Sequence, residues 1–366
     1  MNQIIPIAEP ILGKEEEDLV LKGIRSGWIS SIGEYINQFE ERFSKYCNTK
    51  YGITTSNGTT ALHLSLVAAN IGVGDEVIIP SMTFVATANA VSYTGAKPVF
   101  VDSTMETWTI DPDKIKEKIN RRTKAIIPVH LYGHPSEMGR ILSIARKYGL
   151  IVIEDAAEAH GALYKGKKVG SLSDMACFSF YGNKIITTGE GGMILTDNKN
   201  LAKKIRMLRD HGISKRRRYY YPHLGFNYRM TNLQAALGIA QLKKIDQIIQ
   251  RKREIAELYK KYLSPLKNIY LQPEAKWAKN VFWMYSILVV KNGKKNRDFL
   301  IKQLKKRKID SRPFFFPVHK LSRYKENDQC HIAEFLGSSG INLPSSVVLT
   351  DQQVKHVAEN IVNLLA

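Results

Sequence analysis

Cysteine is scarce in this sequence: Cys47, Cys177 and Cys330 are the only three among 366 residues, and they lie far apart. Structural zinc sites need ligands at close spacing, and small secreted proteins use an even number of cysteines for disulfides. The spacing here fits neither arrangement. We therefore expect reduced cysteines and no metal site.

Long apolar runs are also missing. The first ten residues break their apolar character with Pro6, Glu9 and Pro10, and no later run approaches the roughly 20 residues that span a bilayer. We therefore expect a cytoplasmic protein with no membrane partner. Hydrophobic residues still make up 44% of the chain, which is enough to bury the core of one large domain and a smaller one.

Acidic residues are outnumbered by basic ones, 34 against 54, and the formal net charge is +20. Such an excess is typical of proteins that bind nucleic acid, a membrane surface or a small acidic substrate. The one dense cluster, from Lys215 to Tyr221, is basic and then aromatic, which would suit RNA phosphates and bases. No recognisable nucleic-acid module surrounds it. We expect a solvated or substrate-facing loop and no nucleic-acid partner.

Short apolar runs alternate with helical patterns along much of the chain, which indicates an α/β fold with a mostly parallel sheet. We predict strands over residues 77–80, 98–101, 125–129, 150–153, 175–180 and 284–290. We predict helices over residues 35–46, 86–93, 138–148, 201–211 and 297–308, and a long helix from an N-cap at Thr231 towards Tyr262. A shift in composition near Pro265 suggests a large domain over 12–245 and a small domain over 246–366 with 1–11.

One lysine stands in an unusual setting. The predicted strand that ends at Phe180 leads through a Gly-Asn turn to Lys184, and a glycine-rich segment follows at 189–192. A nucleoside-triphosphate loop would need glycine directly before the lysine, where this chain has Asn183. Apolar neighbours such as Ile185 favour the neutral amine, which attacks carbonyl groups. A solvated, inert lysine in a glycine-rich turn would have the same local sequence.

The ends of the predicted strands supply further candidates, because ligands of parallel sheets bind beyond the carboxyl ends of strands. Phe84 and His130 follow two of these strands, and Glu154 to His160 follow a third. Asp155 ends a strongly apolar strand, where an unpaired carboxylate is costly. It either caps the next helix or pairs with a cation, such as the protonated ring nitrogen of a pyridine cofactor.

A polar turn from Thr54 to Gly58 leads into an Ala- and Leu-rich helix. Free N–H groups at a helix start, with the hydroxyls of Thr59 and Thr60, form a site for one phosphate, although an ordinary cap has the same pattern. Pyridoxal 5′-phosphate (PLP) needs a reactive lysine, an acid on its ring nitrogen and a phosphate site. The three candidates together predict a PLP enzyme.

Four motifs resemble the sugar aminotransferases of the DegT/DnrJ/EryC1/StrS family, at residues 56–62, 154–161, 182–192 and 227–232. The resemblance runs essentially from end to end. It implies a fold type I PLP-dependent aminotransferase with a large, mostly parallel-sheet domain and a smaller C-terminal α+β domain. It also implies a homodimer with shared active sites and leaves a higher assembly open.

The resemblance also implies roles for single residues. Lys184 would bind the cofactor covalently, Asp155 would hold the pyridine nitrogen, and Phe84 would stack on the ring. Glu158 would lie near the ring hydroxyl. The phosphate would be held by Ser56, Gly58, Thr59, Ser179 and, from the neighbouring subunit, Asn227. The sugar substrate would be contacted by Trp28, Ser30, His134, His160, Arg229, Phe316 and His319.

Further motifs resemble the branch of the family that transfers an amino group from L-glutamate to C4 of GDP-4-keto-6-deoxy-D-mannose: 27–31, 128–135, 312–315 and 340–346. A 4- or 3-aminotransferase acting on a UDP- or dTDP-linked ketosugar is the alternative. A PLP-dependent ketosugar dehydratase is disfavoured, because that branch replaces the lysine with histidine. A cofactor-binding regulator remains a further reading, and RNA binding by residues 215–221 is the weakest.

Overall fold

The computed structural model describes residues 4–214, 217, 219–290, 294–325 and 329–365. Its largest element is a seven-stranded sheet in the order β1-β9-β8-β5-β4-β2-β3. Strand β9 is antiparallel to both of its neighbours and the other adjacent pairs are parallel, which confirms the mostly parallel sheet. The strands are β1 (Tyr51–Thr55), β2 (Glu76–Pro80), β3 (Lys97–Val101), β4 (Thr123–Ile126), β5 (Ile151–Asp155), β8 (Met175–Ser179) and β9 (Gly192–Thr196).

The predicted strand over 125–129 is wrong at its C-terminal end, because β4 stops at Ile126. Pro128 has no N–H group to donate to a ladder. Its carbonyl still accepts the N–H of Asp155 at 2.9 Å, and Val129 forms an isolated bridge with the same residue. The chain after β4 therefore stays beside the end of β5, which brings the segment from Val129 to the site described below.

Alternate residues of the parallel strands pack on opposite faces of the sheet, as the pleat requires. Ile78, Ile126 and Val152 pack with Ile141 of α6 (Met138–Tyr148) on one face. Their sequence neighbours, such as Ile79, pack on the other face with α3 (Gly58–Ala68) and α4 (Ala86–Tyr93). Burial on both faces explains why these strands are continuous apolar runs in the sequence.

The predicted long helix after Thr231 is two helices, which meet at Lys244 with φ −100° and ψ −1°. Thr231 is the N-cap as predicted, because its hydroxyl accepts the N–H of Gln234 at 3.2 Å. The two helices are α8 (Asn232–Lys243) and α9 (Ile245–Leu263). The remaining helices are α1 (Lys14–Arg25), α2 (Glu34–Tyr46), α5 (Pro112–Lys118), α7 (Lys199–Arg209), α10 (Lys294–Lys306), α11 (His331–Ser339) and α12 (Asp351–Leu365). Short 3-10 turns lie at Leu131–Gly133, Val318–Lys320 and Ser322–Tyr324.

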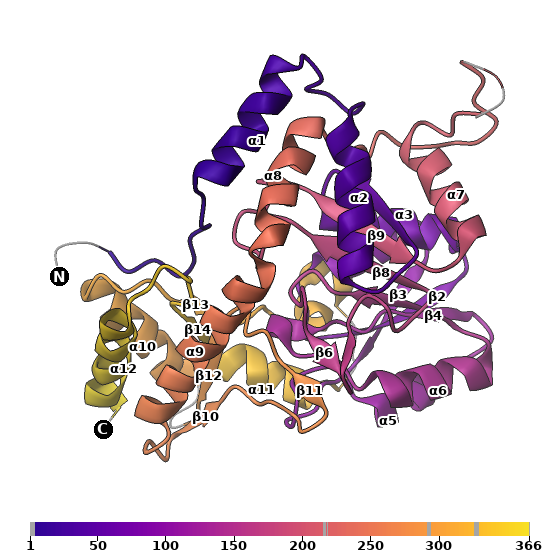
Figure 1. Cartoon of the computed structure of the whole chain (residues 1–366). Helices are drawn as coiled ribbons and strands as arrows, with labels where there is room; N and C mark the ends of the chain where they lie inside the picture. The colour runs from indigo at the N-terminus through magenta and orange to yellow at the C-terminus, as the bar shows by residue number, and fades with distance from the viewer. Residues whose placement is uncertain (1–3, 215–216, 218, 291–293, 326–328, 366) are drawn as a thin grey trace.

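A second, antiparallel sheet, called the small sheet below, has the order β10-β12-β14-β13. Figure 1 shows helices α10 and α12 at this end of the molecule, where both chain termini also lie. Its strands are β10 (Ile269–Leu271), β12 (Tyr285–Val289), β13 (Arg312–Pro313) and β14 (Gly340–Leu343). A third sheet contains β11 (Ala278–Lys279), β6 (Leu163–Tyr164) and β7 (Lys167–Lys168).

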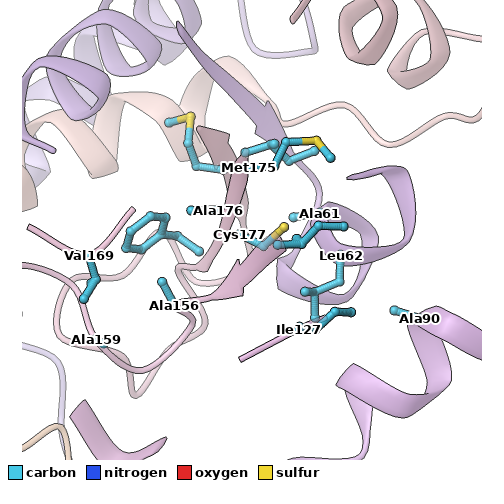
Figure 2. Close-up of a cluster of buried hydrophobic side chains, with 14 of the residues drawn as sticks. Ala61, Leu62, Ala90, Ile127, Ala156, Ala159, Val169, Met175, Ala176 and Cys177 are labelled. Carbon is cyan, nitrogen blue, oxygen red and sulfur yellow. The ribbon is translucent and has the colours of Figure 1, made fainter. Parts of the chain in front are cut away.

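The large core surrounds β8, whose five residues are all buried. Figure 2 shows Ala61 and Leu62 of α3 on one side of this strand, and Ala156 and Val169 on the other. Each large apolar side chain buried in such a core contributes roughly 1.5–3 kcal/mol. The packing fixes the backbone of β8, and therefore fixes the turn that begins where the strand ends at Ser179.

Candidate active site

A cavity of about 460 Å³ lies where the carboxyl ends of β5 and β8 face the start of α3 and one edge of the small sheet. This is the place at which parallel sheets bind ligands. The cavity brings together seven of the residues predicted to bind the cofactor: Gly58, Thr59, Phe84, Asp155, Glu158, Ser179 and Lys184.

Lys184 lies in the turn that follows β8, and its N–H donates to the carbonyl of Tyr181 at 2.9 Å. Only 11% of its side chain is exposed. Its Nζ is 3.6 Å from Oε1 of Glu158 and 3.9 Å from the ring centroid of Trp283. Burial lowers the pKa of Lys184, while the carboxylates of Glu158 and Asp155 oppose that shift. The inert, solvated lysine that the local sequence allowed is therefore not what the fold produces.

Asp155 is the last residue of β5, and 6% of its surface is exposed. Its Oδ2 accepts the hydroxyl of Thr87 at 2.8 Å, and its Oδ1 accepts the N–H of Ala157 at 3.2 Å. Burial raises the pKa of this carboxyl group, which the two hydrogen bonds oppose. No cation lies within ion-pair distance of it in the described part of the chain. A positively charged group entering the cavity would therefore find a buried carboxylate without an ion-pair partner.

Glu158 is held by backbone and faces the lysine. Its Oε2 accepts the N–H of Tyr132 at 2.8 Å, while Oε1 faces Lys184. Burial raises the pKa of Glu158 to about 7, although Lys184 and the Tyr132 hydrogen bond lower it. Tyr132 has a left-handed backbone with φ 51°, a strained conformation for a bulky residue. The strained turn thus aims a donor at the carboxylate that pairs with the lysine.

The start of α3 has the form of an anion site. Asn57 caps the helix by accepting the N–H of Thr60 at 2.9 Å. The N–H groups of Gly58 and Thr59 have no hydrogen-bond acceptor among the described residues. A Cβ added to Gly58 would lie 2.8 Å from Cβ of Ser179, so only glycine lets these two elements approach. Two free donors and a nearby hydroxyl therefore point into one corner of the cavity.

Aromatic side chains form one wall of the cavity. Phe84 lies just before α4 and is 54% exposed, and its ring centroid is 5.5 Å from that of Phe315. Tyr132 stacks on Phe315, with centroids 5.4 Å apart, and on Trp283 at 6.2 Å. A flat ring entering the cavity would have aromatic faces available for stacking.

Three of the predicted substrate residues are histidines that the fold buries outside the cavity, and their contact with the sugar stays a prediction. His160 packs among Phe43, Phe178 and Phe180, and burial lowers its pKa to about 3. His134 accepts the N–H of Ala275 through Nε2 at 3.0 Å. His319 bonds to the hydroxyl of Ser81. Each is at most 1% exposed and none lines the cavity.

The other predicted contacts lie on the surface, outside the cavity of this chain. Trp28 is 56% and Phe316 59% exposed, and Ser30 is exposed on the same loop as Trp28. Arg229 pairs with Asp210 at 2.8 Å and donates to Oδ1 of Asn227 at 3.0 Å. Ser56, also outside the lining, hydrogen-bonds through its hydroxyl with Thr60 at 3.1 Å. Their predicted roles stay predictions.

No role was predicted for Trp283, Arg312 or Asn342, which line the cavity in or beside the small sheet, although Arg312 and Asn342 lie in the motifs 312–315 and 340–346. Arg312 and Asn342 are partners in the β13–β14 ladder. Arg312 has no ion-pair partner within the described ranges, so it presents a free cation to the cavity. A Trp directly before a predicted strand and an Arg-Pro pair before an aromatic run were the available signals.

Other regions add little to the site. Lys215, Arg216 and Arg218 of the basic cluster lie outside the described residues, so the prediction about that cluster does too. No described helix is long and apolar enough to cross a membrane. Cys47, Cys177 and Cys330 are buried and form no disulfide within the described residues.

The profile of the DegT/DnrJ/EryC1/StrS aminotransferase family matches residues 10–362. The chain is 49% identical to the GDP-perosamine synthase of Caulobacter vibrioides, over 96% of each chain. It is 47% identical to the GDP-perosamine synthase of Escherichia coli O157:H7, over 98% of this chain and 97% of that protein. Its fold is similar to that of PseC from Helicobacter pylori, an aminotransferase involved in pseudoaminic acid biosynthesis, with a TM-score of 0.94, 28% identity and 99% of each chain covered.

Proposed function

Because the chain belongs to the DegT/DnrJ/EryC1/StrS aminotransferase family, we propose that it transfers the amino group of L-glutamate to C4 of GDP-4-keto-6-deoxy-D-mannose. The products would be GDP-perosamine and 2-oxoglutarate. The chain is a PLP-dependent sugar aminotransferase of fold type I. One observation carries the choice of substrate: two relatives that share nearly half of their residues with this chain, over almost its full length, are GDP-perosamine synthases.

The residues of the cavity fit PLP. Asp155 is a buried carboxylate without an ion-pair partner in the described structure, which suits a protonated pyridine nitrogen. The free N–H groups of Gly58 and Thr59, with the hydroxyl of Ser179, suit a phosphate. Lys184 supplies an amine of lowered pKa in the same cavity.

We assign the residues as follows. Lys184 would hold the cofactor through its amine, Asp155 would pair with the ring nitrogen, and Phe84 would pack on the ring. Gly58, Thr59 and Ser179 would hold the phosphate, joined by Ser56 and by Asn227 of a second copy. When bound, PLP withdraws electrons from the carbon that loses its proton.

Proton transfer falls to the chain's own residues. Nζ of Lys184 would take the proton from the α-carbon of L-glutamate and deliver a proton to the cofactor carbon on the other side of the transferred nitrogen, and the ketosugar half-reaction would run in reverse. The lowered pKa of Lys184 supports this role, because a general base must be uncharged when it receives the proton. Oε1 of Glu158, 3.6 Å from Nζ of Lys184, would stabilise the amine after it has gained the proton.

A homodimer with shared active sites is part of the proposal. Trp28, Asn227 and Arg229 are not among the residues that line the cavity described above, and their side chains are exposed or partly exposed. Their predicted roles would require them to reach the site of a second copy. Arg312 supports the proposed anionic substrate, because it lines the cavity and its guanidinium has no ion-pair partner among the described residues.

We also propose the division into a large domain, 12–245, and a small one, 246–366 with 1–11. Two observations support it. The C-terminal part has an antiparallel sheet of its own, and a separate hydrophobic cluster joins α9, α10, α12 and that sheet. Ile5 belongs to the same cluster and forms a bridge with Ile309, which supports placing the first residues with the small domain.

Product analysis tests the proposal. The purified chain is supplied with PLP, L-glutamate and, separately, GDP-, UDP- and dTDP-linked 4-keto-6-deoxysugars. We expect mass spectrometry to show a GDP-linked amino sugar, and NMR to place the amino group on C4. Amination of a UDP- or dTDP-linked sugar instead would favour the alternative, and a 3-amino product from a 3-ketosugar would change the regiochemistry.

A further inference from the structure

Trp283 lies against Lys184 but has no part in the function proposed above. It precedes β12 of the small sheet, lines the cavity and is 5% exposed. Its ring centroid lies 3.9 Å from Nζ of Lys184, and the amine sits over the ring. An ammonium group in this position is attracted by the negative face of the indole ring.

Two hydrogen bonds and a stacked ring fix Trp283 in place. The indole Nε1–H donates to the carbonyl of Asn183 at 2.7 Å, and the backbone carbonyl of Trp283 accepts from Nζ of Lys252 at 2.9 Å. The ring stacks on Tyr132, with an interplanar angle of 18°. Because Asn183 directly precedes Lys184, the indole N–H ties the small sheet to the turn that carries the lysine.

The carboxyl groups around Lys184 do not stabilise its charged amine at every pH, whereas the ring of Trp283 can. Burial raises the pKa of Glu158 to about 7, so this carboxyl group is partly uncharged at neutral pH. Asp155 is the other carboxylate that acts on the amine, and it is assigned to the ring nitrogen of PLP. His160 packs among phenylalanines outside the cavity and stays uncharged, because burial, and then the charge of Lys184, lower its pKa to about 3. An aromatic face attracts a cation at every pH, including when Glu158 is protonated.

We propose that Trp283 is a positioning residue for Lys184: its ring face receives the protonated amine between proton transfers, and its indole N–H fixes the turn that carries the lysine. The proposal rests on the proposed role of Lys184 and is independent of which sugar is aminated. It concerns contacts within the chain, so it can be tested without cofactor.

The first test measures the pKa of Lys184 in the cofactor-free, full-length chain. The rate of modification by an amine-reactive reagent is followed against pH, by mass spectrometry of the peptide that contains Lys184. Trp283→Leu should lower this pKa by about 0.5–1.5 pH units, because the charged amine loses its aromatic partner. An unchanged or raised pKa in Trp283→Leu would overturn the proposal.

Trp277→Leu is the matched control. Trp277 packs edge-on against Tyr164 and His134 and does not line the cavity. Its replacement removes an indole ring of the same size at a distance from the lysine. The pKa of Lys184 should stay at its wild-type value in this variant, and an equal fall in both leucine variants would point to general loosening and overturn the proposal.

A second measurement does not require Trp283→Leu to fold. Fluorinated tryptophans have nearly the shape of tryptophan but a weaker negative face, so they can replace it throughout the chain. The pKa of Lys184 should fall stepwise with the number of fluorine atoms in the wild-type sequence, and stay constant in Trp283→Phe. A flat series in the wild-type sequence would overturn the proposal.

The loaded enzyme reports on the indole N–H. Trp283→Phe keeps a ring but cannot donate to Asn183, so kcat should fall by about two- to tenfold with little change in the KM for L-glutamate. If kcat is unchanged, the N–H does not position the turn. Failure of the proposed function looks different: the wild-type chain would then form no GDP-linked amino sugar, whatever the pKa series shows.

Discussion

Oε1 of Glu158 lies 3.6 Å from Nζ of Lys184, and burial shifts both groups towards their uncharged forms. It raises the pKa of Glu158 to about 7 and lowers the pKa of Lys184. The shifts reduce the difference in proton affinity between the two side chains, so a proton moves onto or off the lysine at a smaller cost in free energy. This is the property that proton transfer in transamination requires of the lysine.

The Glu158 shift predicts a pH dependence of stability. Between pH 4.5 and 7 the folded chain keeps a proton on Glu158 that the unfolded chain releases, so this group's contribution to stability falls as pH rises through that window. Glu158→Gln does not ionise and should remove the fall, which is at most about 3 kcal/mol. Denaturant unfolding of the cofactor-free chain at pH 5 and pH 8 measures it. Glu117→Gln, at an exposed site, is the control, and an unaltered pH slope in Glu158→Gln would refute the prediction.

Replacement of Lys184 should separate cofactor binding from turnover. Lys184→Ala removes the amine, while Asp155, Gly58 and Thr59 remain to hold the cofactor's ring nitrogen and phosphate. We expect bound PLP by absorbance after gel filtration, and a loss of turnover of roughly 10²- to 10⁴-fold or more. Lys167→Ala, on an exposed strand of the third sheet, should behave like the wild type. A Lys184→Ala enzyme with near wild-type rate would exclude the assigned role.

Asp155 should matter through its charge. Asp155→Asn keeps the shape and can still bond to the hydroxyl of Thr87, but it cannot balance a positive ring nitrogen. We expect the rate to fall by roughly a hundredfold or more. Thr87→Val removes the hydrogen bonds of its hydroxyl to Asp155 and Thr83 but keeps the charge of Asp155, so its effect should be smaller. Steady-state kinetics at saturating PLP compare the variants, and equal losses in the two would argue against a role for the charge.

The start of α3 gives a test of the phosphate site. In Gly58→Ala the new Cβ would meet Cβ of Ser179 at 2.8 Å, so the helix start or β8 must shift. We expect a loss of stability of about 1–3 kcal/mol and weaker PLP binding, because Gly58 and Thr59 would no longer aim their N–H groups together. Gly182→Ala has no heavy atom within 4 Å of its new Cβ and is the control. Fluorescence titration with PLP measures the affinity, and tight binding by Gly58→Ala would remove the helix start from the phosphate site.

The parts of the site predicted from sequence depend on local chemistry. Lys184, Asp155 and Gly58 follow strands or begin a helix, and the apolar runs show where those strands end. The carboxyl ends of neighbouring parallel strands lie at one edge of a sheet, so residues far apart in sequence could be expected in one cavity.

The rest of the site could not be predicted for one physical reason: the sequence does not show which way a side chain faces once the chain leaves regular structure. Glu158 and His160 are two residues apart, yet one lines the cavity and the other packs between Phe178 and Phe43. No role was predicted for Trp283 and Arg312, because their place at the cavity depends on pairing within the small sheet and on where that sheet lies, not on a local pattern.

The central claim is tested most directly by two half-reactions on one sample. The PLP-loaded chain is treated with L-glutamate, the amino acid is removed, and GDP-4-keto-6-deoxy-D-mannose is added. We predict that the visible absorbance of the lysine-bound cofactor disappears with L-glutamate and returns with the GDP sugar, but not with UDP- or dTDP-linked ketosugars. Return with one of those sugars instead would contradict the choice of substrate, and a band that L-glutamate never bleaches would contradict its role as the amino donor.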